Sequence, residues 1–451
     1  MRTAVRGYAG LLADRDFRRL WIAQSISQLG TQVTNLALPL VAIVALKVSA
    51  LEVAALGAIE FLPFLLFTLP AGVWVDRLEK RRLLVAADLG RAAILGLVPA
   101  AALAGVLSIW LLYVVAFAAG TLTVVFDISY QAFVPELVAR DRLQEGNSRL
   151  EISRSAAIVV GPGLGGLLVG VMTAPLAIVV DAISYLGSAS FLFGLGRRRR
   201  PSATPPPGGP SKVRPAGSLR SEMAEGLRYF IAQPLLRASS GSIVILNFGG
   251  QISNAILLVF AVRELGLRAE AIGLAISIGS LGVLAGATTA AGVGRRFGIG
   301  PTLIVASAGS GVATAILVVA NAGNAFWLLV ASGLINGYGA MLITINGLSL
   351  RQAVTPDALQ GRVNATGRWI NWSVIPVGAM LGGLLAGVIG LRATVAVSAL
   401  LLFLSVPWLL LSPLRTQREL PRLGEAGPPI GLGPAADEAV GIDGPVLHTP
   451  G

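Results

Sequence analysis

Three acidic residues lie inside long apolar stretches of the chain, where a charged side chain is costly. Glu60, Asp127 and Asp181 are each surrounded in sequence by mainly hydrophobic residues. A carboxyl group in such a setting marks a functional site by default, and its usual chemistry is the uptake and release of a proton. The alternative for each acid is a structural role as a protonated or hydrogen-bonded carboxyl.

Amide side chains form a second candidate site. The amides of the first apolar run fall within about a third of a helix circumference, so that one helix face is polar. In a membrane this face must contact protein or water, which favours a cavity lining over simple hydrogen bonding between helices. A matching set follows in the seventh apolar run. The predicted cavity residues are Gln28, Gln32, Asn35, Asn247, Gln251 and Asn254.

The elements that hold these residues are membrane helices. Of the 451 residues, 54% are hydrophobic and 13% are charged, which is about half the charged share of a soluble protein. Apolar runs of about 20 residues recur, each long enough to span a bilayer. We therefore predict an all-α polytopic membrane protein. Its twelve transmembrane helices are expected at 17–46, 51–75, 83–106, 108–134, 148–171, 174–196, 238–262, 268–293, 301–321, 325–350, 364–389 and 393–412.

Basic residues give the orientation. Even-numbered connections are rich in Arg and Lys, including nine basic residues between Arg197 and Arg237, whereas odd-numbered connections hold few. Basic loops stay in the cytoplasm, so we expect a multi-pass protein of the inner (plasma) membrane with both termini cytoplasmic. The Arg197–Arg200 run is interpreted as a topology anchor, and no nucleic-acid partner is expected.

The chain divides into two related halves. We expect a six-helix N-terminal half (1–196), a cytoplasmic linker (197–237), a six-helix C-terminal half (238–412) and a disordered cytoplasmic tail (413–451). Gly30 matches Gly249 and Asp127 matches Asn346 at an offset of 219, which adds Asn346 to the cavity candidates. The shared offset predicts a pseudo-twofold axis with a site between the halves.

Catalytic and metal-binding patterns are missing from the sequence. There is no cysteine, and the single histidine, His448, is in the tail. The glycine-rich stretch at 161–166 is not a dinucleotide loop, because it lies within an apolar span and no strand precedes it. Asp88 and Arg91, three residues apart, are expected to form an ion pair. We predict that the chain is not an enzyme and needs no metal or other cofactor.

A charged turn between the second and third spans carries the family resemblance. Gly72, Asp76, Arg77, Lys80 and Arg81 occupy the places of the signature Gly-x-x-x-Asp-Arg-x-Gly-Arg-Lys/Arg, and Glu79 replaces its second glycine. The chain therefore resembles the major facilitator superfamily. Gly161, Pro162, Gly165 and Gly166 are similar to the helix-five signature of its antiporters. The opening from Phe17 to Gly30 is similar to the branch that contains macrolide efflux pumps and enterobactin exporters.

The resemblance implies a fold and a mechanism. In that superfamily, helices 1, 4, 7 and 10 line a cavity that opens alternately to each side, which ranks Asp127 first and Glu60 second as proton carriers and Asp181 below them. The helix-four arginine of many drug exporters has no clear counterpart here. We expect a monomeric, proton-coupled exporter of a small amphipathic molecule such as a drug, antibiotic or siderophore, with a proton gradient as its energy source. An importer or facilitator on the same fold is the alternative.

The charged turn also suggests a conformational role. At an offset of 220, Gly292 matches Gly72, but Arg296 matches Asp76, so the second half keeps the basic residues and lacks the acid. We therefore interpret Gly72, Asp76, Arg77, Lys80 and Arg81 as an asymmetric cytoplasmic latch. This latch would hold the two halves together on the cytoplasmic side and release when they rock.

Overall fold

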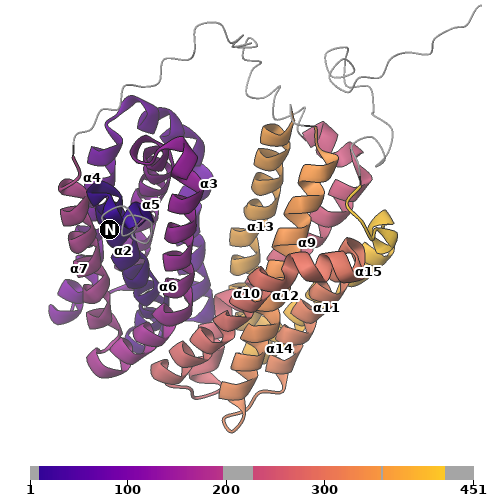
Figure 1. Ribbon diagram of the computed structural model, residues 1–451. Coiled ribbons are helices and arrows are strands. Elements are labelled where there is room, and N and C mark those ends of the chain that lie inside the picture. The colour runs from indigo at the N-terminus through magenta and orange to yellow at the C-terminus, as the bar shows by residue number, and fades with distance from the viewer. Residues whose placement is uncertain (1–9, 197–226, 357–358, 422–451) are drawn as a thin grey trace, which may run out of the picture.

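The computed structural model is a bundle of helices over the residues it describes, 10–196, 227–356 and 359–421 (Figure 1). Within that part of the chain, twelve segments are long and apolar enough to cross a membrane, as the sequence predicts. The first six are α2 (Arg15–Leu40, continued by a π-helical turn at Val41–Ala45), α3 (Ala50–Arg77), α4 (Lys80–Leu103), α5 (Ile109–Leu137), α6 (Leu143–Met172) and α7 (Ala174–Phe193). The other six are α9 (Pro234–Arg263), α10 (Ala269–Phe297), α11 (Ile299–Val318), α12 (Ala325–Val354), α13 (Gln360–Ile389) and α14 (Leu391–Phe403) with α15 (Ser405–Leu410).

Local sequence signals explain where helices begin. Asp14 precedes α2, and its carboxylate accepts from the backbone N–H groups of Asp16 and Phe17. Ser49 and Glu52 form a reciprocal capping box at the start of α3. Such caps satisfy backbone donors that have no partner within the helix. At the turn between α3 and α4, Glu79 has φ −69° and ψ 107°, an extended conformation that does not need glycine.

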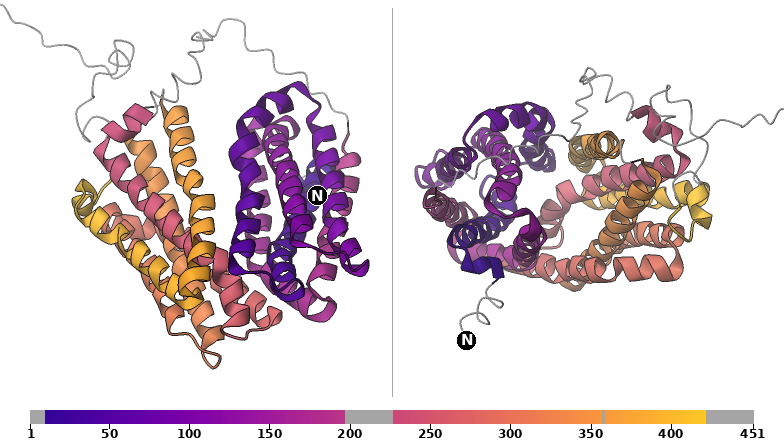
Figure 2. Two further views of the ribbon diagram at one scale, coloured as in Figure 1. Left: turned by 180° about the vertical axis from the view of Figure 1, so that it is seen from behind. Right: turned by 45° about the horizontal axis from the view of Figure 1, so that its top comes forward.

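The two halves contact each other at one end of the bundle. In Figures 1 and 2 they meet at one end and diverge toward the other, where α7 ends and α9 begins. We call the end where α7 ends and α9 begins the linker side. The contacts between halves pair α6 with α10 and α3 with α13. Glycines permit this close approach, because Gly166 faces the backbone of Ala269 and Gly273.

The packing repeats at the sequence offset. Gly161 packs against the side chain of Gln32, and Gly378 packs against the side chain of Gln251 in the same way. The two glycines are 217 residues apart in the sequence, and the two glutamines are 219 residues apart. Likewise, Gly166 faces Ala269 and Gly273, while Gly383 faces Ala50 and Ala54, and both pairs of partners differ by 219. The two halves therefore place equivalent residues in equivalent contacts.

Two boundaries differ from the sequence-based expectation. Helix α9 begins at Pro234, four residues earlier than 238, because proline fits the first turn of a helix and Gln233 supplies the preceding extended residue. The expected disordered tail starts with folded residues. Leu414 is fully buried, and the N–H of Gly300 at the start of α11 donates to the carbonyl of Gln417 at 2.9 Å. Residues 422–451 lie outside the described residues, as do residues 197–226 of the expected linker.

Candidate transport cavity and its charged groups

A central cavity of about 340 Å³ lies between the two halves. Gln32 and Asn35 of α2 line it from the N-terminal half, and Gln251 and Asn254 of α9 line it from the C-terminal half. The apolar part of its wall comes from α2, α3, α6, α9, α10 and α13. The polar groups that sequence pairing placed on opposite halves thus share one cavity.

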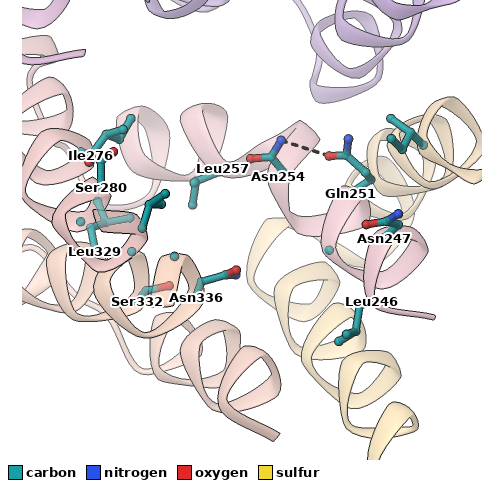
Figure 3. Close-up of a pocket in the computed structure, with 16 residues that line it drawn as sticks. Leu246, Asn247, Gln251, Asn254, Leu257, Ile276, Ser280, Leu329, Ser332 and Asn336 are labelled. Atoms are coloured by element: carbon teal, nitrogen blue, oxygen red, sulfur yellow. Dashed lines mark hydrogen bonds between the residues drawn. The ribbon is translucent and has the colours of Figure 1, made fainter. Parts of the chain in front are cut away.

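A second pocket of about 420 Å³ continues the cavity into the C-terminal half. The two share Gln251, Asn254, Leu257, Ile276 and Ile375. Figure 3 shows the amides of Asn247, Gln251 and Asn254 along one face of α9, with Asn254 donating to Gln251 at 3.0 Å. Asn247 donates to the carbonyl of Asn371 at 2.9 Å. Together the two pockets offer a mixed wall of apolar side chains and amides, which suits a partly polar organic molecule.

Two of the predicted cavity residues lie elsewhere. Gln28 is half-buried on α2, one turn nearer the linker side than Gln32, and is not part of the wall of either pocket. Asn346 is only 5% exposed, and its amide donates to the carbonyls of Leu342 and Ala290. Asn346 therefore faces α10 inside the C-terminal half, and placing it in the cavity from its offset alone was wrong.

The structure adds polar residues that sequence reasoning missed. Ser332 and Asn336 of α12 and Ser280 of α10 line the second pocket (Figure 3). Ser332 and Asn336 are four residues apart in an apolar span, so both fall on one helix face. That spacing was visible in the sequence.

Glu60 is the one charged residue among the described residues that line the two pockets. It is half-buried on α3 and makes no hydrogen bond within the described part of the chain. Its neighbour Phe61 also lines the central cavity and contacts Trp372 of α13 edge-to-face, with ring centroids 6.0 Å apart. A carboxyl and an aromatic ring thus share the wall formed by α3.

Asp127 does not line either pocket. It is partly exposed on α5, and the positive charges that act on it are Arg91 of α4 and Arg154 of α6. No hydrogen bond joins it to another described residue. Its position gives it access to a basic group inside the N-terminal half rather than direct contact with a bound molecule.

Asp181 is fully buried on α7 and is strongly hydrogen-bonded. Thr34 of α2 donates to one carboxyl oxygen at 2.5 Å, and Ser184 donates to the other at 3.0 Å. Nearby on α4, the predicted ion pair between Asp88 and Arg91 is present and is also buried. Two acids and one base therefore lie together between α2, α4 and α7.

The described residues of the charged turn make contacts within their own half. Lys80 forms an ion pair with Glu136 of α5 at 2.7 Å. Arg81 donates to the carbonyls of Leu192 and Phe193 at the end of α7. Arg77 is exposed. Gly72 and Asp76 fall within α3, but their side chains lie outside the described part. In this conformation the turn braces three helices on the linker side, where the halves are apart.

The helix-five residues lie where the halves meet. Gly161 and Gly165 face α2, and Gly166 faces α10. The N–H of Gly163 donates to the hydroxyl of Ser277 in the second half at 2.8 Å. On the same side, Arg263 of α9 donates to the carbonyl of Val48 at 2.5 Å. These contacts close the cavity on the side opposite the linker.

Comparison with known proteins agrees with this architecture. A family model described as "Transmembrane secretion effector" matches residues 7–426. The multidrug efflux pump Tap of Mycolicibacterium fortuitum is 28% identical over 387 residues, covering 84% of this chain and 89% of the pump. The enterobactin exporter EntS of Citrobacter koseri is 25% identical, covering 66% of this chain and 68% of the exporter.

Solved structures share the fold. A bacterial homologue of the iron transporter ferroportin, in an inward-facing state, superposes with a TM-score of 0.68 at 19% identity, covering 89% of this chain and 99% of that one. A bacterial homologue of the lysosomal transporter Spinster, also inward-facing, gives 0.67 at 15% identity, covering 88% and 97%. These likenesses concern the fold alone.

Proposed function

Because the chain belongs to the transmembrane secretion effector family of the major facilitator superfamily, we propose that it is a proton-coupled exporter of a small amphipathic molecule. The family and its efflux relatives make it a multi-pass transporter of the plasma membrane. Our proposal adds three properties to this: the direction of transport, the ion that drives it and the class of substrate.

The observation that carries the proposal is the central cavity. It is lined by both halves and closed on one side by the contacts of α6 with α10 and α3 with α13. Rocking of the halves about that interface would expose the same wall to the other side. The basic connections lie on the linker side, which we assign to the cytoplasm together with both termini. The conformation is then the one that loads substrate from inside the cell.

The wall of the cavity supports an amphipathic substrate. Its surface is mainly apolar, with amides at Gln32, Asn35, Gln251 and Asn254 and one carboxyl at Glu60. Such a wall binds a molecule with an apolar body and a few polar groups, and it accepts a positive charge more readily than a negative one. Drugs, antibiotics and siderophores fit this class, in line with the multidrug and enterobactin exporters among the relatives.

Proton coupling requires an acid whose protonation opposes substrate binding. Glu60 is suited to this by its place in the wall, and Asp127 by its partial exposure next to Arg91. In an antiporter, the proton and the substrate bind in alternation, so each weakens the binding of the other by the same factor. No further cofactor is needed for this cycle.

The test is the pH dependence of binding. The purified protein is titrated with ethidium, erythromycin or enterobactin, and the Kd is measured across a range of pH. Competition with one proton predicts that Kd rises up to about tenfold per unit of falling pH. In Asp127→Asn we expect binding to persist and the proton-driven transport of the probe to be lost. Asp141→Asn, which changes an exposed acid outside the cavity, serves as the control.

Other results would change the proposal. Binding that strengthens with added protons would indicate an importer that moves both in one direction. Binding and transport that are indifferent to pH and to uncouplers would indicate a facilitator. Wild-type proton-driven transport by both Asp127→Asn and Glu60→Gln would remove these two acids from the coupling step.

A further inference from the structure

The N-terminal half buries a group of charged residues that the substrate cavity does not use. Asp88 and Arg91 lie on α4, and Asp181 lies on α7. All three are at most 4% exposed. We call Asp88, Arg91 and Asp181 the buried triad. None of the three lines either pocket.

Arg91 is the centre of the triad. Its guanidinium pairs with Asp88 and stacks between two aromatic rings, 4.3 Å from the centroid of Phe126 and 4.2 Å from that of Tyr185. Asp181 and the partly exposed Asp127 also lie within its electrostatic range. With all groups charged, the triad holds two negative charges and one positive charge, so it has a net charge of −1 in a low-dielectric setting.

The triad has buried polar atoms that lack partners. One carboxyl oxygen of Asp88 and the Nε of Arg91 make no hydrogen bond, although neither atom reaches solvent. The hydroxyl of Ser188 is buried and lies beside Asp88. Buried polar atoms without partners are rare in a folded protein, and a functional role is one of the recognised reasons for them. A proton on the carboxyl of Asp88 would supply a donor at this point and would cancel the net charge.

The second half shows that packing does not need these charges. At the offset of 219, Asp88 and Arg91 correspond to Ser307 and Ser310, and at 217 Asp181 corresponds to Ser398. The equivalence is spatial, because Asp181 faces Gly30 while Ser398 donates to the carbonyl of Gly249, the residue that matches Gly30. Both serines of α11 and Ser398 are buried. The same fold is therefore built once with charges and once with hydroxyls.

The triad is joined to the cavity by a single helix. Thr34 of α2 donates to Asp181, and Thr31 shares a hydrogen bond of 2.8 Å with the Tyr185 hydroxyl. The neighbouring residues Gln32 and Asn35 line the cavity on another face of the same helix. A change of charge at Asp181 alters the bond to Thr34 and so acts on the helix that presents two of the cavity amides.

We propose that the buried triad binds the coupling proton. One proton from solution joins the carboxylate of Asp88 or that of Asp181 to form a carboxylic acid, and the same O–H bond breaks when the proton leaves. The two acids act as one coupled unit with Arg91, so the proton is assigned to the pair and not to one residue. Asp127 also interacts with Arg91 and is partly exposed, whereas Asp88 and Asp181 are buried. This proposal rests on proton-coupled transport but has its own test.

Infrared difference spectroscopy of the purified protein tests the triad without any substrate. Acidification is expected to produce a band of a protonated carboxyl in the wild type. The band should be lost or shifted in Asp181→Asn and in Asp88→Asn. It should be retained in Glu60→Gln, which changes the cavity, and in Ser398→Ala, the matched site of the second half. A band unchanged in both triad variants, or one removed by Glu60→Gln, would overturn the proposal.

Transport gives the functional readout. In proteoliposomes, Asp181→Asn is expected to lose ethidium accumulation driven by a pH gradient while keeping equilibrium exchange of ethidium, which needs no net proton movement. Thr34→Val, which removes only a donor to the carboxylate, should keep uphill transport and shift its pH profile to higher pH. If the wild type and Asp181→Asn show equal proton-driven accumulation of ethidium, the proposal for the triad is wrong and the proposed function stands. If the wild type shows no coupling, the proposed function fails, and the infrared result still decides whether the triad binds a proton.

Discussion

Burying the ion pair of Asp88 and Arg91 has a desolvation cost that its attraction must offset. Removing two charges from water costs several kcal/mol per ion, and their attraction repays this only when the geometry is good. Here both side chains are buried and an oxygen of Asp88 stays unpaired. The serines at the matching positions of the second half show a neutral solution that the same fold tolerates.

Replacing one partner of the ion pair should therefore destabilise the protein more than replacing both. Arg91→Met leaves Asp88 as an unpaired buried acid, and we expect a loss of about 3–5 kcal/mol in stability. The double variant Asp88→Ser with Arg91→Ser copies Ser307 and Ser310 and should recover most of that loss. Thermal unfolding of the two variants in one detergent measures the difference. A double variant no more stable than Arg91→Met would contradict the reasoning.

Residue-level prediction succeeded where one helix face decided the contact. The ion pair followed from the spacing of Asp88 and Arg91, and the amides of Gln32 and Gln251 followed from helical periodicity. It failed where a side chain had two neighbouring helices to face. Asn346 donates to α10. Asn336, which lies on the same helix and was not among the predicted residues, lines the second pocket. The three-dimensional proximity of Asp181 to Arg91 could not be read from positions 90 residues apart.

At the scale of helices, the contact between α6 and α10 sets the closed side of the cavity. A Cβ atom on Gly166 would meet the backbone carbonyl of Ala269 and the Cα of Gly273. Backbone atoms cannot move aside as a flexible side chain does. The two helices are therefore held at the distance that glycine allows.

Gly166→Leu should separate α6 from α10 and favour the conformation that is open on that side. Overpacking of about 1–3 kcal/mol corresponds to a population shift of about 5- to 150-fold. The chain has no cysteine, so Leu258→Cys in the cavity wall provides a single labelling site. Labelling by an impermeant maleimide from the side opposite the linker should rise by that factor.

Gly187→Leu is the matched control for this experiment. Gly187 lies within α7, and a Cβ there meets no atom within 4 Å. It should leave labelling of the cavity cysteine at the wild-type rate. Equal labelling in Gly166→Leu and Gly187→Leu would show that the glycine contact does not hold the halves together.

Helix positions were the most predictable level of the structure. Apolar runs of bilayer length placed all twelve helices, because a membrane allows few other structures for such runs. Their ends were less predictable. The helices α5, α6 and α12 extend several residues past the apolar runs on the linker side, where polar residues such as Glu136 and Arg142 form ion pairs in place of lipid contacts.

At the scale of the molecule, two similar halves carry different charges. The N-terminal half holds the buried triad and the charged turn, whereas the second half has serines at the triad positions and Arg296 at the position of Asp76. The two halves are thus similar in packing and different in charge. The offset of 219 predicted the two halves and their packing, because residues that make equivalent contacts in the two halves are separated by nearly the same number of residues. It did not predict which of the two alternate conformations the structure adopts.

The charged turn is expected to act on that conformational balance. We propose that Asp76 stabilises the state that is closed on the linker side, as part of the latch with Lys80 and Arg81. Asp76→Asn should increase labelling of Leu258→Cys from the linker side and leave the Kd for ethidium within about twofold, since Asp76 is far along α3 from Glu60 in the cavity wall. Unchanged labelling would count against the latch.

Vectorial transport in proteoliposomes is the most direct test of proton-coupled export. Vesicles are prepared with an acidic lumen, and ethidium is added outside with an impermeant reagent that inactivates molecules whose linker side faces the lumen. We predict that ethidium accumulates in the lumen as protons leave, and that nigericin, which collapses the gradient, abolishes the accumulation. Accumulation that is unaffected by nigericin, or that appears only when protons flow inward with the probe, would contradict proton-coupled export.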